Sequence, residues 1–551
     1  MIPAADWQPS GGLVLEPNGL SAVTTIDRNV VVAAGPGAGK TELLAQRADF
    51  LLRTGHCPYP RRILAISFKV DAARNLRDRV RLRSGIELAA RFDSFTFHGF
   101  AKRLVDNYRG LLTGIDALPA DYLLDQHDRI QGVQITFDDL VPLALKILDT
   151  GGYPRGALRQ TYSHVFLDEF QDTTKNQYAL VRSAFAGTTA MLIAVGDVKQ
   201  RIMVWAGALH GVLEDFADDF DALPLPLYLN RRSAPRLRRM QNRIVAVMDP
   251  AAVSPDEDLA GEEGSIRSIA AATDQEEAQL VADLIEDWLT DTPPAEIAVL
   301  VRQQPHLVAA PLAQQLQERG IPYRNEQASQ DLAAEPVAAI IFDFIRVVAE
   351  DRQSHAYSDL LRLAHRAALT EEAARQFDSR LRRLLHEART HVRTSEFVKD
   401  HLDTWKRLVN EFLDHIGRPT LIALSPSYQQ GNRLDDVISQ AFNAFGHELE
   451  VDGDPATALK RLSDEGAVRF LTIHKCKGLE FEKVIVLGVE QELFWGNDEE
   501  ALSEFFVAIS RAKTDLVLTH VSHRALPDEP VKRWSEHRTP YTEFLNFAID
   551  S

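Results

Sequence analysis

Short, mostly apolar runs alternate with longer stretches of helical periodicity through the first half of the chain. Runs of this kind are too short for helices and are typical of strands that are buried on both faces. The predicted strands cover residues 30–34, 63–67, 164–167 and 191–195, and the predicted helices cover 41–52, 70–82 and 174–186. Because helices separate the strands, this part of the sequence predicts an α/β domain with a parallel sheet and crossover helices.

A proline-containing stretch at 223–229 leads to a second α/β section. Its predicted strands cover 225–229, 266–269, 297–301, 469–473, 483–488 and 515–519. Between about 335 and 460 the pattern is almost wholly helical, and we interpret this segment as a helical insertion in the second α/β domain. The chain contains no solenoid-type repeat and no low-complexity linker.

Length and composition limit the class of protein. The chain has 551 residues, enough for about three or four domains, and 45% of them are hydrophobic, which excludes a disordered protein. Its two cysteines, Cys57 and Cys476, lack the spacing of a metal site, so the sequence excludes a disulfide scaffold and predicts a cytoplasmic protein. The N-terminus lacks the features of a signal peptide, and no apolar run approaches the ~18 residues of a membrane span. We therefore expect no membrane partner.

The net charge of −18 counts mildly against a nucleic-acid-binding protein, which is expected to be basic where it binds. Local charge matters more than the total. Three basic clusters occur: Arg74, Arg77, Arg79, Arg81 and Arg83; Arg231, Arg232, Arg236, Arg238 and Arg239; and Arg380, Arg382, Arg383, Arg389 and Arg393. For any single cluster, a solvated helix face is the favoured interpretation.

An apolar strand at 165–167 ends in the carboxylates Asp168 and Glu169. Ligands bind at such strand ends in open α/β sheets. Two acids at this point suit a metal-bound nucleotide, with one carboxylate holding Mg²⁺ and the other orienting a water molecule. The alternative is a strand followed by an acidic turn. Gln171 and Asp172 behind the pair, together with a phosphate-binding loop upstream, favour the nucleotide site.

The upstream loop follows a predicted strand and opens a predicted helix, which is the context that a P-loop requires. Its glycines allow the backbone N–H groups to face phosphate oxygens, and the helix N-terminus attracts anions. Lys40 supplies a charge to the β- and γ-phosphates, and Thr41 supplies a hydroxyl for Mg²⁺. The loop consists of Ala34, Gly35, Pro36, Gly37, Ala38, Gly39, Lys40 and Thr41, with Ala34 in place of the first glycine of the strict pattern.

These segments are part of an ordered series that resembles the motifs of superfamily 1 helicases of the UvrD/Rep/PcrA type. The resemblance runs from about residue 13 to 519, with a gap over the helical insertion. It rests on the order of the motifs, which is more specific than any one of them. The matching segments are 63–74, 96–100, 137–140, 168–172, 195–202, 229–233, 472–481 and 507–513.

The resemblance implies two RecA-like P-loop motor domains with parallel sheets, each carrying a helical insertion. We expect the first motor at 1–222, with a short helical insertion at about 100–137, and the second at 223–334 and 461–551. The helical accessory insertion would cover 335–460. ATP would bind between the two motor domains, and single-stranded DNA would run across the top surface of both domains. We expect no nuclease domain after the last motif, because few residues remain.

The resemblance assigns catalysis to Lys40, Asp168, Glu169, Gln200, Arg232 and Arg511. It implies that Asp168 and Thr41 hold Mg²⁺, that Glu169 positions the attacking water and that Gln200 senses the γ-phosphate. Two arginines from the second motor would stabilise charge at the γ-phosphate only when the domains close. Nucleotide binding would use the loop, Arg231 and Glu480, which would bond the ribose, and the cofactors would be ATP and Mg²⁺.

The same resemblance implies a set of DNA contacts, in which aromatic rings stack on bases without reading their sequence. These residues are Phe68, Thr96, Phe97, His98, Trp205 and His474.

Two pairs of substitutions depart from the family pattern. Gly19 stands where the family carries the glutamine that reads adenine, and Arg231 stands where a tyrosine stacks on the base. We therefore expect weakened selectivity for ATP. Near Trp205, Met203 and Ala206 replace a tyrosine and an arginine, which predicts a lighter grip on the DNA strand.

The favoured function is a DNA-dependent ATPase that moves 3′→5′ along single-stranded DNA and separates the duplex at junctions, with direction and substrate implied by the resemblance alone. A second hypothesis is a DNA-stimulated ATPase subunit beside a nuclease, in repair or anti-phage defence, with weak unwinding of its own. A third is a non-catalytic binding module, which the intact Lys40, Glu169 and Arg511 disfavour.

Overall fold

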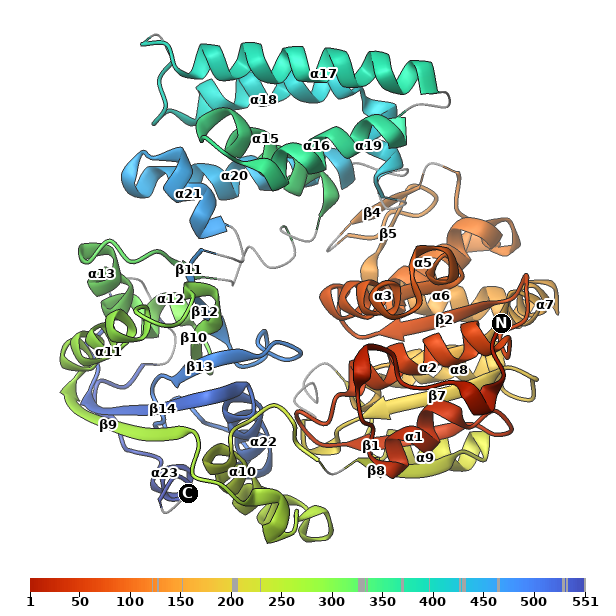
Figure 1. The fold of residues 1–551 in the computed structure, drawn as a ribbon, viewed down its shortest axis with the longest axis horizontal. Coiled ribbons are helices and arrows are strands. Elements are labelled where there is room, and N and C mark those ends of the chain that lie inside the picture. The colour runs from red at the N-terminus through yellow and green to blue at the C-terminus, as the bar shows by residue number, and fades with distance from the viewer. Residues whose placement is uncertain are drawn as a thin grey trace. The chain divides into compact units, whose positions relative to one another are not determined.

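A computed structural model describes residues 1–551 with several gaps (Figure 1). The gaps are 121, 126–127, 151, 201–206, 228, 326–331, 333–334, 368–370, 396, 426–427, 429–432, 463–465, 528–530, 532–533 and 550–551.

The first sheet has six strands, all paired in parallel. From one edge to the other, the order is β3 (Phe92–Thr96), β2 (Arg62–Ser67), β6 (Tyr162–Leu167), β7 (Met191–Gly196), β1 (Val30–Ala34) and β8 (Leu223–Leu227). The four strands predicted in the first half of the chain are confirmed.

Helices cover both faces of this sheet, because alternate strand residues point to opposite sides. Val30 and Val32 belong to the core under α1 (Pro17–Thr24), α2 (Lys40–Thr54) and α3 (Val70–Ser84). Val31 belongs to the core on the other face. The helices there are α5 (Phe97–Tyr108), α6 (Phe137–Thr150), α7 (Gly152–Thr161), α8 (Lys175–Phe185) and α9 (Val212–Phe220). The predicted crossover helices and parallel sheet are thus confirmed.

Two sequence-based expectations are corrected here. The strand predicted at 225–229 does not belong to the second α/β section, because β8 pairs with β1 at the edge of the first sheet. An edge strand tolerates Pro224 and Pro226, which cannot donate hydrogen bonds to a further neighbour. The stretch 100–137 is also not wholly helical, since β4 (Leu123–Asp125) and β5 (Gln134–Thr136) form a small sheet.

A second sheet also has six strands. They are β9 (Ser265–Thr273), β10 (Ile297–Val301), β11 (Tyr323–Asn325), β12 (Val468–Thr472), β13 (Phe481–Val486) and β14 (Ala512–His523). β12 pairs in parallel with β10 and β11, and β13 pairs in parallel with β14. With two largely parallel sheets, the fold is the α/β class expected of two RecA-like domains.

The described chain divides into two compact units. The first consists of Met1–Ser268, Cys476–Leu518 and Thr539–Ser551, and the second of Ile269–Lys475 and Thr519–Arg538. This division follows compactness and differs from the boundaries expected from the motifs, which stay a prediction.

Residues between 336 and 462 are helical wherever the structure describes regular elements, and they share one hydrophobic core. The helices are α15 (Pro336–Ala349), α16 (Ser354–Ala367), α17 (Glu371–Val392), α18 (Leu402–Ile416), α19 (Arg418–Ala423), α20 (Arg433–Asp452) and α21 (Pro455–Leu462). The helical character predicted for this segment is confirmed.

The remaining α-helices are α4 (Ile86–Ala89), α10 (Pro235–Met248), α11 (Asp274–Trp288), α12 (Pro305–Val308), α13 (Ala310–Glu318), α22 (Asp498–Ile509) and α23 (Thr542–Asn546). None of the helices in the described part of the chain is long and apolar enough to cross a membrane.

Candidate functional site

The predicted phosphate-binding loop connects β1 to α2. Gly37 and Gly39 have φ angles of 70° and 80°, which glycine adopts at little cost. Gly39 caps α2, so the loop ends at a helix N-terminus, where backbone N–H groups attract anions. The Nζ atom of Lys40 lies 3.4 Å from the carbonyl oxygens of both Ala34 and Gly35. Backbone donors and a positive charge therefore meet at this loop, and Thr41 follows in the first turn of α2.

The segment after β8 packs directly on the loop. The backbone N–H of Arg231 donates to the carbonyl oxygen of Gly37 over 3.0 Å. A Cβ atom on Gly37 would lie 2.0 Å from Asn230 Oδ1 and 2.8 Å from Arg232 Cβ. Only glycine fits this approach, which brings the predicted nucleotide residues Arg231 and Arg232 to the P-loop.

The acidic pair lies at the end of β6, next to the end of β2. Asp168 is only 3% exposed, and its Oδ2 accepts a long hydrogen bond of 3.5 Å from the Ser67 hydroxyl. The N–H of Glu169 donates to Asp168 Oδ1 over 3.1 Å. Glu169 adopts a left-handed backbone with φ 51° and ψ 44°, which is uncommon for a residue with a side chain. The predicted pair therefore lies in a strained turn at the carboxyl end of β6.

The pKa values of the two carboxyl groups are displaced in opposite directions. Burial, followed by the negative charge of Glu169, raises the pKa of Asp168. Burial would also raise the pKa of Glu169, but the charges of Lys40 and Lys477 and a hydrogen bond from Gln171 hold it below its usual value. Glu169 is thus firmly ionised, and a nearby cation would favour ionisation of Asp168.

Gln171 holds the Glu169 carboxylate in place. Its Nε2 donates to Glu169 Oε2 over 2.7 Å, and its Oε1 accepts from the backbone N–H of Asp197 over 3.0 Å. Gln171 is fully buried, so these contacts are shielded from water. The sequence placed Gln171 in the acidic motif without a role, and the structure makes it the link between Glu169 and the turn after β7.

That turn is η6 (Val198–Gln200), and it contacts two of the later motifs. Arg511 Nη2 donates to Gln200 Oε1 over 2.6 Å, and Lys477 Nζ donates to the Gln200 carbonyl oxygen over 2.6 Å. Lys477 Nζ also pairs with Asp172 Oδ2 at 2.5 Å. All four residues are at most 5% exposed. The acidic motif, the predicted γ-phosphate sensor and Arg511 therefore form one buried network.

Arg232 lies beside this network and contacts two of the later motifs. Its Nε donates to Glu480 Oε2 over 2.8 Å, and its Nη1 donates to the carbonyl oxygen of Ser510 over 3.0 Å. Burial would raise the pKa of Glu480, but the positive charge of Arg232 holds it below its usual value. In this structure the predicted ribose ligand is thus bonded to a predicted γ-phosphate ligand.

The residues present fit a nucleotide with a hard cation. Gln200 Nε2 is buried and has no hydrogen-bond partner among the described residues, so an anionic oxygen would satisfy it. The P-loop supplies N–H groups and Lys40, while Thr41 and Asp168 carry the oxygen ligands that Mg²⁺ prefers. No cluster of three or more His, Cys, Asp or Glu side chains suited to a metal occurs within the described ranges.

The predicted DNA contacts are only partly brought together. Phe68 and His98 are half-buried, burial lowers the pKa of His98, and Thr96 caps α5 by accepting from the Gly99 N–H over 3.0 Å. The ring of Phe97 packs in the hydrophobic core and is 3% exposed, so it offers no stacking surface here. Trp205, Met203 and Ala206 lie outside the described residues, and His474 lies in the second compact unit.

Three arginines of the second basic cluster, Arg236, Arg238 and Arg239, have structural contacts, whereas Arg231 and Arg232 lie at the P-loop. Arg238 donates to the carbonyl oxygen of Asp258, and Arg239 donates to those of Leu259 and Gly261. Arg236 pairs with Glu262. These arginines fasten the loop after α10 to that helix, which favours the structural interpretation of this cluster over nucleic-acid binding.

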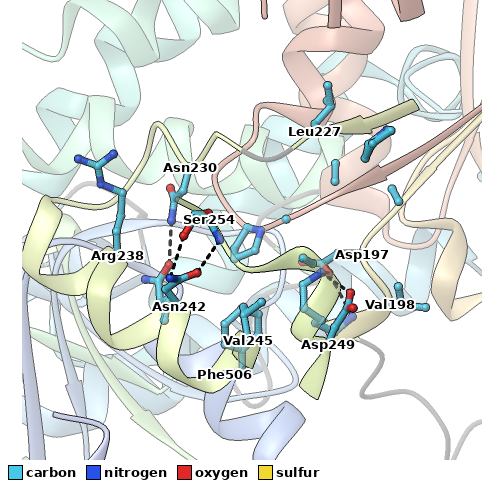
Figure 2. A pocket seen from close by; sticks show the side chains of 18 of the residues that line it. Asp197, Val198, Leu227, Asn230, Arg238, Asn242, Val245, Asp249, Ser254 and Phe506 are labelled. Atoms are coloured by element: carbon cyan, nitrogen blue, oxygen red, sulfur yellow. Dashed lines mark hydrogen bonds and ion pairs between the residues drawn. The ribbon is translucent and has the colours of Figure 1, made fainter. Parts of the chain in front are cut away.

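A cavity of about 240 Å³ lies beside the network (Figure 2). Its lining comes from the loop residues Ala33–Pro36, the turn Asp197–Lys199, the end of β8 and α10 with the residues after it. Figure 2 shows Asp197 and Asp249 on one side of it and Asn230, Asn242 and Ser254 on another. The cavity adjoins the P-loop and η6 without being lined by Lys40, Asp168 or Glu169.

Comparison with known proteins gives concordant matches. The profile of the UvrD/REP helicase N-terminal domain matches residues 15–136 and 121–221, and that of the UvrD-like helicase C-terminal domain matches 455–523. DNA helicase II of Escherichia coli (strain K12) is 24% identical over 618 residues, covering 92% of this chain and 84% of that protein. The ATP-dependent DNA helicase PcrA of Bacillus subtilis (strain 168) is 23% identical over 625 residues, covering 93% and 83%.

The ordered motifs, the two α/β sheets and the P-loop network agree with these matches. The chain therefore belongs to the UvrD/Rep/PcrA family of superfamily 1 DNA helicases, as a compact, ATP-hydrolysing member.

Proposed function

We propose that the protein uses ATP and Mg²⁺ to move 3′→5′ along single-stranded DNA and to separate the duplex at a junction. One contact carries this proposal, the hydrogen bond of 2.6 Å between Arg511 Nη2 and Gln200 Oε1. A motor of this kind needs a cation that reaches the γ-phosphate sensor, so that hydrolysis depends on the arrangement of the chain around the nucleotide. The relatives named as DNA helicases support the substrate.

Each residue of the network has a proposed role. Lys40 and the loop N–H groups bind the phosphates, and Thr41 and Asp168 hold Mg²⁺, which neutralises charge on the phosphates. Glu169 orients the attacking water and is itself oriented by Gln171. Gln200 accepts from Arg511 and offers its free Nε2 to the γ-phosphate.

The pairing of Arg232 with Glu480 supports an exchange on nucleotide binding. The ribose hydroxyls would take the Glu480 carboxylate, and Arg232 would turn to the γ-phosphate. The base of its side chain already lies next to the P-loop, because Arg232 Cβ approaches Gly37. The arginine would thus be delivered only when the complete nucleotide is in place.

The proposed contacts with single-stranded DNA are Phe68, Thr96, His98, Trp205 and His474. Phe97 is dropped from this set, because its buried ring would have to leave the core in order to stack on a base. A backbone-tracking motor needs phosphate contacts together with sequence-tolerant stacking.

The test measures ATP hydrolysis with and without single-stranded DNA, and unwinding of duplexes that carry a 3′ or a 5′ tail. The proposal expects hydrolysis to rise with DNA and only the 3′-tailed duplex to be unwound. Unwinding from the 5′ tail would refute the direction. Stimulated hydrolysis without unwinding would favour the alternative of an ATPase subunit that works beside a nuclease.

Glu169→Gln is the matched control variant. It keeps the size of the side chain but removes the carboxylate that orients water, and we expect turnover to fall by about 10²–10⁴-fold. Binding of a fluorescent ATP analogue should survive, because Glu169 is not assigned a nucleotide contact. Turnover within tenfold of the parent protein would refute the role of Glu169.

A further inference from the structure

The residue before Gln200 makes an ion pair that the proposed function does not use. Lys199 Nζ lies 3.7 Å from Asp249 Oδ2 and 3.7 Å from Asp197 Oδ1. Its side chain is 13% exposed, and that of Asp249 is 40% exposed. The turn η6 therefore carries two neighbouring contacts, the sensor contact of Gln200 and the ion pair of Lys199.

α10 connects this ion pair to Arg232. Asp249 is the C-cap residue of α10, and Arg232 comes shortly before its first residue, Pro235. The helix has 14 residues and is therefore about 21 Å long. Leu237, Met240 and Ile244 are buried along it. Because a continuous helix is a rigid element, a displacement at the Arg232 end would reach Asp249.

Because of the cavity shown in Figure 2, the ion pair between Lys199 and Asp249 matters more than its distance of 3.7 Å suggests. Val198 and Lys199 line it from the turn, and Val245 and Asp249 line it from α10 and its cap. Packing between the turn and this end of α10 is therefore incomplete beside the pair. Because the Lys199 side chain is largely shielded from water, its charge is screened less than that of an exposed lysine.

We propose that Lys199 and Asp249 form a positioning contact that transmits movement of α10 to the sensor Gln200. Movement of Arg232 toward the γ-phosphate would then reach Gln200 by two routes, through the nucleotide and through α10. This inference rests on the proposed function for the roles of Gln200 and Arg232 and for DNA-stimulated hydrolysis as its main readout.

The test compares Lys199→Met, Asp249→Asn, the double variant and Lys199→Arg. We expect each single neutral variant to lower DNA-stimulated kcat about tenfold, with KM for ATP and unstimulated kcat within about twofold. The double variant should lose no more than either single variant, because both remove one contact. Lys199→Arg keeps the charge and should restore most of the stimulation.

Lys102→Met is the matched control, since Lys102 pairs with Asp106 at 2.7 Å within α5 and away from the nucleotide loop. It should leave stimulation unchanged. The inference is overturned if the two single effects add in the double variant, if unstimulated kcat falls equally, if the control shows the same loss, or if neither single variant loses stimulation.

A second readout does not depend on DNA. Hydrogen exchange of residues 237–249 is measured with and without a nonhydrolysable ATP analogue. We expect the analogue to protect this segment in the parent protein and not in Lys199→Met. Equal protection in both proteins, or none in the parent, would overturn the inference. A parent protein that DNA does not stimulate would refute the proposed function instead, with this readout still deciding the role of Lys199.

Discussion

Glu169 combines a left-handed backbone with a half-buried, ionised carboxylate. Such a conformation costs about 1–3 kcal/mol for a residue with a side chain, so the surroundings must hold it. Gln171 does so from one side, and the charges of Lys40 and Lys477 act on the same carboxylate. These contacts thus keep the proposed water-orienting group in place, against its backbone strain, before the nucleotide arrives.

Base selectivity is the first prediction at the residue scale. Gly19 lies buried in α1 and offers no side chain to a base, so kcat/KM for ATP, GTP and CTP should agree within about a hundredfold. A Cβ atom there would meet its nearest neighbours at 3.5–3.7 Å, which is ordinary contact. The position therefore has room for a Cβ atom, and Gly19→Gln should raise the preference for ATP.

Kinetics with the three nucleotides on both proteins would check this. A parent preference for ATP above a hundredfold would refute the expectation. A Gly19→Gln protein with normal stability and unchanged discrimination would show that this position does not face the base.

His164 gives a pH prediction. It is 4% exposed in β6, and burial followed by the charge of Arg47 lowers its pKa to about 3. Below about pH 6.5 the His164 imidazole binds a proton in the unfolded chain but not in the folded protein. The contribution of His164 to the free energy of unfolding is therefore fully present above this pH and falls as the pH decreases. The loss should reach about 1.4 kcal/mol one unit below pH 6.5.

Thermal unfolding between pH 7.5 and 5.5 measures this loss. His164→Gln should flatten the dependence, whatever its effect on absolute stability. His386, which is exposed on α17, is the control, and its replacement by Gln should leave the slope unchanged. An equal slope in the parent and His164→Gln would assign the acid sensitivity to other groups.

At the scale of elements, individual buried ion pairs join segments that are distant in the sequence. Arg524, just after β14, pairs with Glu277 of α11 at 2.8 Å, and the two side chains are 1% and 2% exposed. Arg524 Nη2 also donates a hydrogen bond of 3.0 Å to Glu277 Oε1, so both terminal nitrogens of the guanidinium contact the carboxylate. A buried carboxylate of this kind is stable only while its partner remains.

Arg524→Met should therefore destabilise the second compact unit by about 3–5 kcal/mol, because Glu277 is left buried and uncompensated. The double variant Arg524→Met/Glu277→Leu should recover much of this loss, since no buried charge remains. Chemical denaturation of the three proteins checks the expectation. A double variant less stable than Arg524→Met would show that packing, and not the uncompensated charge, causes the loss.

At the scale of the whole molecule, the net charge of −18 says little about the site, because charge is distributed unevenly. Arginines and lysines converge on the P-loop network, while those of α10 fasten a loop. The helices between 336 and 462 have a core of their own, which includes Phe344 stacked on Phe412 at 4.1 Å. This separate core supports the proposed accessory insertion.

A fragment of residues 336–462 should accordingly fold alone. Far-UV circular dichroism should show a helical spectrum and a cooperative thermal transition. Phe344→Ala should lower the stability of the fragment by about 3–5 kcal/mol, because it opens a cavity in that core. A non-cooperative transition in the parent fragment would argue against an independent domain.

How far the sequence predicts this protein differs between the sheets and the site. The strands at 30–34 and 164–167 were predictable because they are apolar runs flanked by helices. The pairing of 223–227 was not, because its two prolines fit either a linker or an edge strand. Phe97 was expected to meet DNA, and its burial depends on α5 packing against the first sheet.

By itself the sequence determined the kind of chemistry. The spacing of the P-loop, the acid pair and the later motifs depends on local backbone geometry, which is written in neighbouring residues. Only the tertiary structure decided which of these groups touch. Arg511 and Gln200 lie 311 positions apart, as Lys477 and Asp172 lie 305 apart. Asp172 and Gln200 follow β6 and β7 of the first sheet, whereas Lys477 and Arg511 lie beside strands of the second sheet, so these contacts depend on the packing of segments that are distant in the sequence.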